Sequence, residues 1–168
     1  MTKKLLFFSF FLGALSSLSL PPFNFFFINF FTFSIFFIFL FKELDHSNKM
    51  IFFLHGWLFG FGYFLSNIYW ITISLTFDQD LNFLVPIALI VIPAFLALFY
   101  GIVTFVFYIF SLKNLISAFF LFSLLFGLVE YIRGNILTGF PWNLIVYSFS
   151  DNIKFLSFLS VVGTYSLN

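Results

Sequence analysis

Residues 83–110 read FLVPIALIVIPAFLALFYGIVTFVFYIF, 28 positions without a charged side chain. A helix needs about 20 apolar residues to cross the hydrocarbon core of a bilayer, and its backbone groups are then paired internally. This run is longer than one straight crossing, so we expect tilt, or kinks at Pro86 and Pro93, to absorb the excess. The stretch therefore predicts a transmembrane helix.

The composition of the whole chain points to the same class of protein. Hydrophobic residues occupy 62% of the 168 positions and charged residues only 8%, against roughly a half and a quarter in a soluble domain. No fold in water hides so much apolar surface. Phe alone accounts for 35 residues, most of which we interpret as lipid-facing. The chain is therefore predicted to be an all-α, polytopic integral membrane helical bundle.

Short polar breaks divide the rest of the chain into further apolar segments. Pro21 and Pro22 end the first segment, and a charged run at 42–49 ends the second. The first segment is also similar to a secretory signal peptide, but a second apolar segment follows at once, which favours a turn between two retained helices. We expect one transmembrane domain over 1–168, with about five helices at roughly 5–20, 23–41, 50–75, 83–110 and 115–130 and the start of a sixth at 153–168.

Basic residues near the helix ends predict the orientation, because the cytoplasmic loops of membrane proteins are enriched in Lys and Arg. If the N-terminus is cytoplasmic, five basic residues lie inside and two lie outside: Lys3, Lys4, Lys42, Lys49 and Lys113 against Arg133 and Lys154. This count favours a cytoplasmic N-terminus, and it places residues 131–152 on the outer face.

Charge and residue usage exclude several kinds of function. The net charge is +1 and the basic residues are scattered, so no patch follows a nucleic-acid backbone. The absence of Cys excludes disulfides, thiolate metal sites and a thiol nucleophile within the chain. Asp78 and Asp80 have too few neighbouring oxygen ligands for a Ca²⁺ loop, and we interpret His55 as a buried, hydrogen-bonded imidazole. We expect no metal site and no cofactor.

Three glycines in the segment at 50–75 are candidates for helix packing. Gly56 and Gly60 have the small-xxx-small spacing that allows two membrane helices to approach closely, and Gly62 follows in the same helix. We expect these positions to lie against neighbouring helices.

Residues 131–152 form the longest segment that a membrane crossing does not explain. Glu130 and Arg133 stand at its start, three positions apart, so on a continuing helix they share one face and can pair. Ionisable side chains at membrane depth usually line a cavity or a pathway. Two interpretations stay open: a site near the outer leaflet, or an ion pair that merely ends the fifth helix.

A second cluster follows in the same segment: Thr138, Gly139, Phe140, Pro141, Trp142 and Asn143. Pro141 favours extended backbone in the residue before it, and Gly139 allows a tight bend. Irregular backbone at membrane depth needs protein or water around it, whereas Trp142 fits the headgroup level. The cluster is either part of a cavity or a plain interfacial loop with an aromatic anchor.

Taken together, Glu130-Tyr131-Ile132-Arg133-Gly134 and Leu137-Thr138-Gly139-Phe140-Pro141-Trp142-Asn143 resemble the signature of bacterial apolipoprotein N-acyltransferases, E-[FWY]-[LI]-R-G-x(3)-T-G-F-P-W. Gly60-Phe61-Gly62 with residues 67–75 is similar to the family's third helix, and residues 18–23 are similar to its first turn. The resemblance covers essentially the whole chain but only the N-terminal part of the family's membrane domain. Family members continue through eight helices and carry a nitrilase-like domain whose Glu, Lys and Cys perform the chemistry.

The resemblance implies a multi-pass protein of the bacterial inner membrane that serves acyl transfer from a phospholipid to the N-terminal amino group of a lipidated apolipoprotein. The implied partners are the phospholipid donor, the apolipoprotein acceptor and a catalytic domain that is separately encoded or missing. Because the chain has no Cys, we expect it to be inactive alone and to position lipid for the reaction. No catalytic residue is carried onto this chain, and the implied positioning residues are Glu130, Arg133, Thr138, Gly139, Phe140, Pro141, Trp142 and Asn143.

Two other functions remain as alternatives. A small transporter or channel subunit would need polar side chains that face each other deep in the helices, and the first, second and fourth segments offer almost none. A non-catalytic membrane remnant is the other alternative, and a fragment or a split gene is compatible with the resemblance itself.

Overall fold

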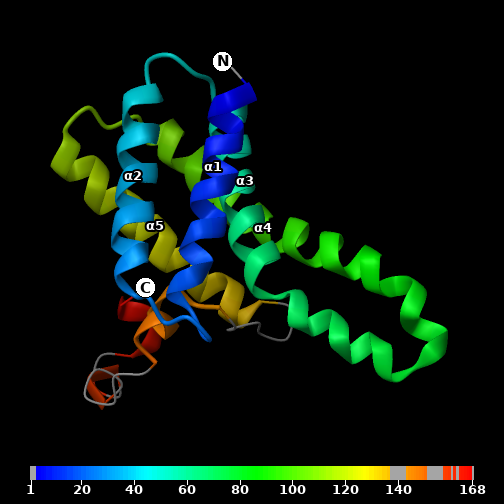
Figure 1. The fold of residues 1–168 in the computed structure, drawn as a ribbon. Coiled ribbons are helices and arrows are strands. Elements are labelled where there is room, and N and C mark those ends of the chain that lie inside the picture. The colour runs from blue at the N-terminus through cyan, green and yellow to red at the C-terminus, as the bar shows by residue number, and fades with distance from the viewer. Residues whose placement is uncertain (1–2, 137–142, 151–156, 160, 162, 168) are drawn as a thin grey trace.

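The computed structural model describes residues 3–136, 143–150, 157–159, 161 and 163–167, and every regular element in these ranges is helical (Figure 1). The prediction of an all-α fold is therefore confirmed. The elements, in chain order, are α1 (Lys3–Ser16), η1 (Ser17–Ser19), α2 (Phe27–Glu43), α3 (Lys49–Asn67), η2 (Tyr69–Phe77), η3 (Gln79–Leu84), α4 (Val85–Phe110), α5 (Leu115–Asn135), η4 (Ile145–Phe149) and η5 (Thr164–Leu167).

Two of the helix starts are fixed by asparagine caps that the sequence places in polar breaks. The Asn48 side chain accepts hydrogen bonds from the backbone N–H groups of Met50 and Ile51, each at 3.0 Å, and so begins α3. The Asn114 side chain accepts from the backbone N–H of Ser117 at 3.0 Å and begins α5. These caps satisfy backbone donors that have no partner within the helix.

Length and composition qualify two helices of the described chain as membrane spans: Asn82–Phe110, which contains α4, and Leu115–Asn135, which is α5. A third span is present if α3 and η2, which are bent by 49° relative to each other, are counted together. The segment Lys4–Ser19 is apolar but shorter. These spans support the membrane class that the composition predicts.

The structure departs from the predicted helix at 50–75, because α3 ends at Asn67 and a 3₁₀ segment follows. Hydroxyl groups in η2 donate to carbonyl oxygens three residues earlier: Thr72 to Tyr69 at 2.6 Å, Ser74 to Ile71 at 2.7 Å and Thr76 to Ile73 at 2.7 Å. Such local bonds compete with the backbone hydrogen bonds of an α-helix. β-Branched residues also lose side-chain freedom in an α-helix, which makes that conformation less favourable here. Hydropathy alone does not predict this break in the helix.

Helix α3 forms the centre of the bundle and lies between α1 and α4. Its Phe59 ring stacks on Phe36 of α2, with ring centroids 4.3 Å apart, and the Tyr100 ring of α4 lies 5.0 Å from Phe126 of α5. Offset and edge-to-face aromatic pairs of this kind pack large side chains without voids. An aromatic core therefore joins the helices around α3.

The glycines at the candidate packing positions lie where a side chain would collide with a neighbouring helix. A Cβ atom on Gly56 would lie 2.4 Å from the Tyr100 carbonyl oxygen of α4, and one on Gly60 would lie 3.0 Å from the Tyr100 Cβ. A Cβ on Gly62 would lie 2.2 Å from the Phe10 carbonyl oxygen of α1. The three positions thus face two different helices, α4 and α1.

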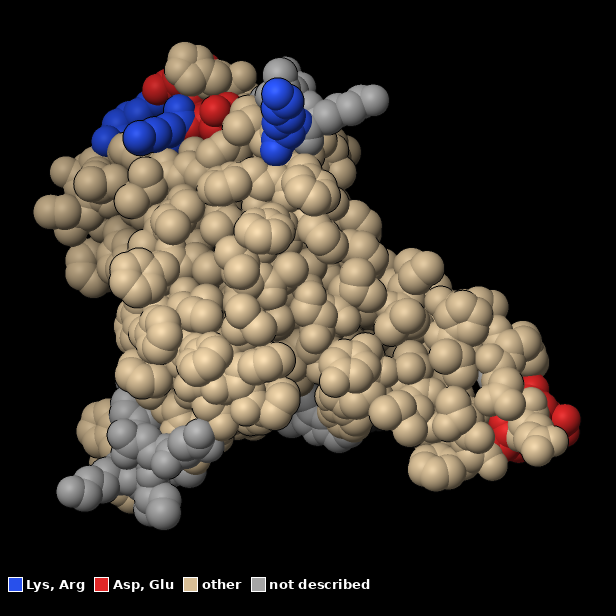
Figure 2. Space-filling view, viewed as in Figure 1, with Lys and Arg blue, Asp and Glu red and all other residues tan. Residues whose placement is uncertain are grey.

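The first turns of α4 project sideways from the bundle together with η2 and η3, as a helical arm (Figure 1). Pro86 lies in the first turn of α4, where its missing N–H removes no hydrogen bond of the helix. It therefore does not produce the kink that the sequence analysis allowed at this position. Pro93 lies inside the helix. Figure 2 shows charged side chains at the end of the bundle that holds the N-terminus and at the tip of the arm, which carries Asp78 and Asp80.

Helix α5 extends five residues beyond the predicted end at Glu130, to Asn135. Its last turns are held by buried side chains, Val129, Glu130 and Arg133. Gly134 also belongs to the helix, and a Cβ there would lie 2.0 Å from the Tyr165 hydroxyl of η5. Gly134 therefore makes room for another element.

Candidate functional site

Glu130 and Arg133 form an ion pair inside the protein at the C-terminal end of α5. The Arg133 Nη2 donates to the Glu130 Oε2 at 2.5 Å, and the two side chains are 1% and 0% exposed. The i, i+3 spacing places them on one face of the helix, as the sequence indicates. Their near-complete burial is more than a plain ion pair at the end of a helix requires.

Aromatic side chains of α3 and α4 surround this pair. The Arg133 guanidinium lies over the Phe64 ring, 5.2 Å from its centroid, in the geometry of a cation–π contact. Tyr63 and Tyr100 are fully buried, and both interact electrostatically with Glu130. The sequence analysis missed all three aromatic residues, because no local pattern links them to a carboxylate that follows them by 30 residues or more.

Asn143 is the one residue of the cluster at 138–143 that the described ranges contain, and it is held against α3. The Tyr63 hydroxyl donates to the Asn143 backbone oxygen at 3.0 Å. Asn143 has a φ of 57°, a left-handed conformation that asparagine tolerates better than most residues. The structure therefore brings together Glu130, Arg133 and Asn143, whereas Thr138, Gly139, Phe140, Pro141 and Trp142 lie outside the described residues.

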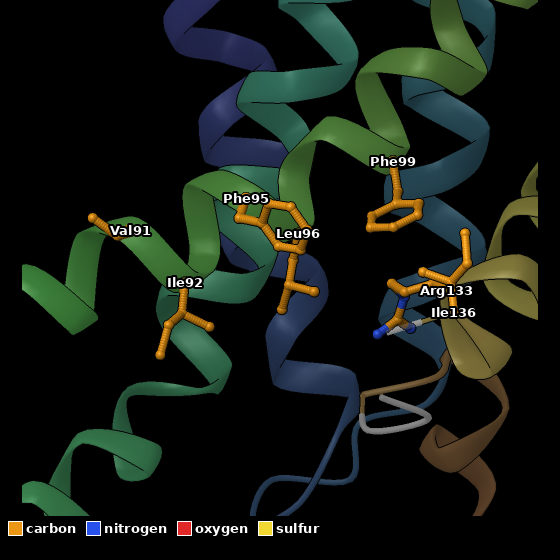
Figure 3. A pocket seen from close by; sticks show the side chains of 7 residues that line it. All are labelled: Val91, Ile92, Phe95, Leu96, Phe99, Arg133 and Ile136. Carbon is orange, nitrogen blue, oxygen red and sulfur yellow. The ribbon is translucent and has the colours of Figure 1, made fainter. Parts of the chain in front are cut away.

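An apolar crevice of about 300 Å³ lies beside Arg133, between α4 and the end of α5 (Figure 3). Its described walls are Val91, Ile92, Phe95, Leu96, Phe99 and Ile136, and among the described lining residues Arg133 alone is charged. Val91, Phe95 and Ile136 are exposed, so the crevice opens at the outer surface of the described bundle. The arrangement is amphipathic, with a buried cation beside an apolar crevice.

These residues suit the binding of an amphiphile better than a chemical step. A guanidinium presents planar donors that match phosphate or carboxylate oxygens, and the apolar walls match hydrocarbon. A nucleophile would need an activating base within hydrogen-bonding distance, and the described residues that line the crevice include no Ser, Thr or Lys. Among the residues that the structure describes, no three His, Cys, Asp or Glu side chains converge in a way that could hold a metal ion.

Comparison with known proteins assigns the chain. Residues 12–168 match the family model "Apolipoprotein N-acyltransferase N-terminal domain". The chain belongs to this family. Glu130, Arg133 and the cluster at 138–143 all lie within the matched residues.

Several curated apolipoprotein N-acyltransferases are similar to the chain over most of its length. The protein of Rickettsia typhi is 40% identical over 160 residues, which cover 95% of this chain and 31% of the relative. The protein of Rhizobium leguminosarum is 34% identical over 160 residues, which cover 90% of the chain and 29% of the relative. The protein of Brucella melitensis is 31% identical over 163 residues, which cover 93% and 30%. The chain spans about three tenths of the length of the curated relatives that it matches.

Proposed function

We propose that this chain is the membrane part of a lipoprotein N-acyltransferase, and that it holds phospholipid for acyl transfer without supplying the catalytic groups. The observation that carries the proposal is the position of Arg133, a buried cation at an apolar crevice, in a chain of the N-acyltransferase N-terminal domain family. The donor is a membrane phospholipid, and the acceptor is the N-terminal amino group of a lipidated apolipoprotein.

The reaction needs a nucleophile that these 168 residues do not contain. A thiolate attacks the phospholipid ester, the lysophospholipid leaves, and the resulting thioester is then attacked by the amine of the apolipoprotein, which restores the thiol. Thiolates are the reactive form of cysteine in such steps, and the chain has no Cys. The chain alone is therefore inactive in this proposal, and the Glu, Lys and Cys groups come from a catalytic domain.

Arg133 is suited to hold the phosphate of the donor at a fixed place. Its guanidinium is oriented by the Glu130 carboxylate and by the Phe64 ring, and a pre-oriented planar fork loses less freedom on binding than a flexible cation would. Phosphate at Arg133 places the hydrocarbon along the apolar walls of α4. Within this proposal, Asn143 and the cluster at 138–142 shape the mouth of the site.

The same proposal includes the finer membrane topology. We place about five crossings and the start of a sixth in the bacterial inner membrane, with the N-terminus in the cytoplasm and residues 131–152 on the periplasmic side. The positive-inside rule supports this orientation, because it leaves five basic residues inside and two outside. Figure 2 shows basic side chains gathered at the end of the described bundle that holds the N-terminus.

A chimeric enzyme tests the proposal. This chain replaces the matching region of the Rickettsia typhi relative, and transfer of a labelled acyl chain to a diacylated peptide is measured. The double variant Glu130→Gln/Arg133→Gln removes the cation without leaving a buried unpaired charge, and we expect at least a tenfold loss with phosphatidylglycerol as the donor. Lys113→Gln, which removes an exposed cation in another loop, serves as the matched control and should keep full activity.

Comparison of two acyl donors separates lipid recognition from misfolding. With diacylglycerol, which has no phosphate, the double variant and the unmodified chimera should differ by less than threefold. Equal losses with both donors would indicate a damaged fold. Unchanged transfer from phosphatidylglycerol would refute a role for Arg133.

A further inference from the structure

A second apolar groove lies between α2 and α5, and it shares no lining residue with the crevice at Arg133. Its volume is about 410 Å³. Phe33 and Phe37 of α2 and Phe122 and Phe126 of α5 line its walls, and none of the described residues that line it is charged. The groove is thus a hydrocarbon-like site within the helical bundle, separate from the proposed acyl-donor site.

Two polar groups in this groove have no hydrogen-bond partner. Asn29 is 6% exposed, and neither its amide oxygen nor its amide nitrogen is bonded. Ser148 of η4 is 3% exposed, and its hydroxyl is likewise unbonded. Both residues line the groove. Unbonded polar groups are costly in an apolar interior, so the pair indicates a ligand that carries hydrogen-bonding oxygen atoms at one end.

Small side chains keep the long side of the groove open. Ser34 of α2 and Ser123 of α5 line the groove and are exposed, and their neighbours in the lining include the exposed rings of Phe30 and Phe119. A side chain as large as Phe at either serine would extend across the opening. Because α5 qualifies as a membrane span by its length and composition, we expect lipid at this opening.

We propose that the groove binds one acyl chain of a membrane phospholipid, with the ester carbonyl of that chain at Asn29 and Ser148. The amide N–H and the hydroxyl donate to the carbonyl oxygen, and the chain extends along the four phenylalanine rings. The volume falls at the lower end of the range of about 300–1,000 Å³ for small-molecule sites, which suits one chain and not both chains of the lipid. This inference depends on the membrane class of the chain, and the acyltransferase proposal can fail without affecting it.

The lining favours a lipid chain over a packed helix as the occupant. Membrane helices approach one another through small residues that bring the two backbones close, as Gly56 and Gly62 do elsewhere in this bundle. Most of the described residues that line the groove are phenylalanines, whose rings hold a neighbouring backbone away. An α-helix is about 10 Å wide with its side chains, whereas a single hydrocarbon chain is narrow enough to enter between the rings.

Photo-cross-linking tests the site on the full 168-residue chain in nanodiscs. The probe is phosphatidylglycerol with a diazirine in the middle of one acyl chain, and labelled peptides are identified by mass spectrometry. We expect labelling concentrated on residues 33–37 and 119–126. Ser123→Phe should reduce this labelling at least tenfold, whereas Leu124→Phe, the next residue and 59% exposed, should leave it unchanged. Ser34→Phe repeats the test from the opposite wall and serves if Ser123→Phe does not fold.

Further arms test the polar end and competition by unlabelled phospholipid. Asn29→Leu keeps the branched shape and the number of heavy atoms of the side chain and removes both polar atoms, so labelling should fall at least threefold, while Asn82→Leu in η3 should have no effect. An excess of unlabelled phospholipid should compete with the probe. Equal labelling of the Ser123→Phe and Leu124→Phe variants, or uniform labelling around the helices, would overturn the proposal.

Discussion

Removing one partner of the buried ion pair of α5 should destabilise the protein far more than replacing both partners together. Glu130 and Arg133 are 0% and 1% exposed and are bonded to each other. Arg133→Met leaves a carboxylate without its cation beside Tyr63 and Tyr100. Removal of one partner from a buried pair typically costs about 3–5 kcal/mol, and we expect the lower end of this range at least, because water has little access to the site.

The double variant should recover most of this loss. Glu130→Leu/Arg133→Met replaces both charges by apolar side chains of similar length, and such replacements are often neutral or even stabilising. We therefore expect the double variant to lie within about 2 kcal/mol of the unmodified protein, with a coupling energy of several kcal/mol between the two positions. The loss of the contact between the Arg133 guanidinium and the Phe64 ring accounts for about 1–2 kcal/mol of the remaining cost.

Reversible unfolding in mixed micelles measures these differences. Sodium dodecyl sulfate is titrated into dodecyl maltoside, and unfolding is followed by the fluorescence of the three Trp residues. A double-mutant cycle over the unmodified chain, the two single variants and the double variant gives the coupling energy. Additive effects, with the double variant as unstable as the sum of the single variants to within about 0.5 kcal/mol, would refute a direct buried pair.

Three other changes have expected outcomes. Gly62→Ala places a Cβ 2.2 Å from a backbone oxygen of α1, so it should lower the free energy of unfolding by about 1–3 kcal/mol in the same titration. Ser9→Ala removes the hydroxyl that bonds the His55 Nδ1 at 2.7 Å, and an unpaired buried imidazole should cost about 1–3 kcal/mol. The Lys113 ammonium, through a hydrogen bond and its charge, lowers the pKa of the Asp45 carboxyl. The stabilisation that this ion pair contributes is therefore fully present above the ordinary pKa of the carboxyl, and it is lost as the pH falls through the lowered pKa. The difference in melting temperature between the unmodified chain and Asp45→Asn should accordingly be largest near neutral pH and disappear in acid.

Matched controls separate these effects from general sensitivity. Gly60→Ala meets its nearest atom, a side-chain Cβ, at 3.0 Å and should cost less than Gly62→Ala. Ser74→Ala removes an exposed hydroxyl and should be neutral, in contrast to Ser9→Ala. High salt should reduce the Asp45→Asn difference, because the pair with Lys113 is exposed and screened. A Gly60→Ala loss larger than that of Gly62→Ala, or an Asp45→Asn difference that grows in acid, would contradict the structural reasoning.

Hydropathy predicts where this chain is helical, because the length of an apolar run and its polar breaks are local properties. The run at 83–110 became α4, with its start at Val85, and the polar breaks contain the caps Asn48 and Asn114. The end of α3 at Asn67 could not be predicted in the same way, since η2 is as apolar as the helix before it. Its signal is the row of hydroxyls at every second position from Thr72 to Thr76, which bond to preceding carbonyls.

The site was only partly predictable, because its partners are distant in the sequence. The i, i+3 spacing indicates that Glu130 and Arg133 can pair, and the structure contains that pair. Their burial depends on Tyr63 and Tyr100, which α3 and α4 bring to the end of α5. The hydrogen bond from Tyr63 to Asn143 spans 80 positions. Contacts over such a sequence separation follow from how the helices pack, and local patterns in one sequence do not specify that packing.

A bundle so rich in phenylalanine needs polar contacts to define how its helices pack, since lipid and protein interior are almost equally apolar. Described polar side chains supply such contacts between helices: Ser9 of α1 to His55 of α3, Ser16 of α1 to Thr32 of α2, Thr104 of α4 to the Phe52 oxygen of α3, and Trp57 of α3 to the Ala94 oxygen of α4. These hydrogen bonds join helices within the protein, which explains them as structural. Asn29 and Ser148 are also buried, but they line a groove and their polar side-chain atoms have no partner. The combination of an unpaired polar end and an apolar groove is the reason to assign the groove to a ligand and the bonded contacts to the fold.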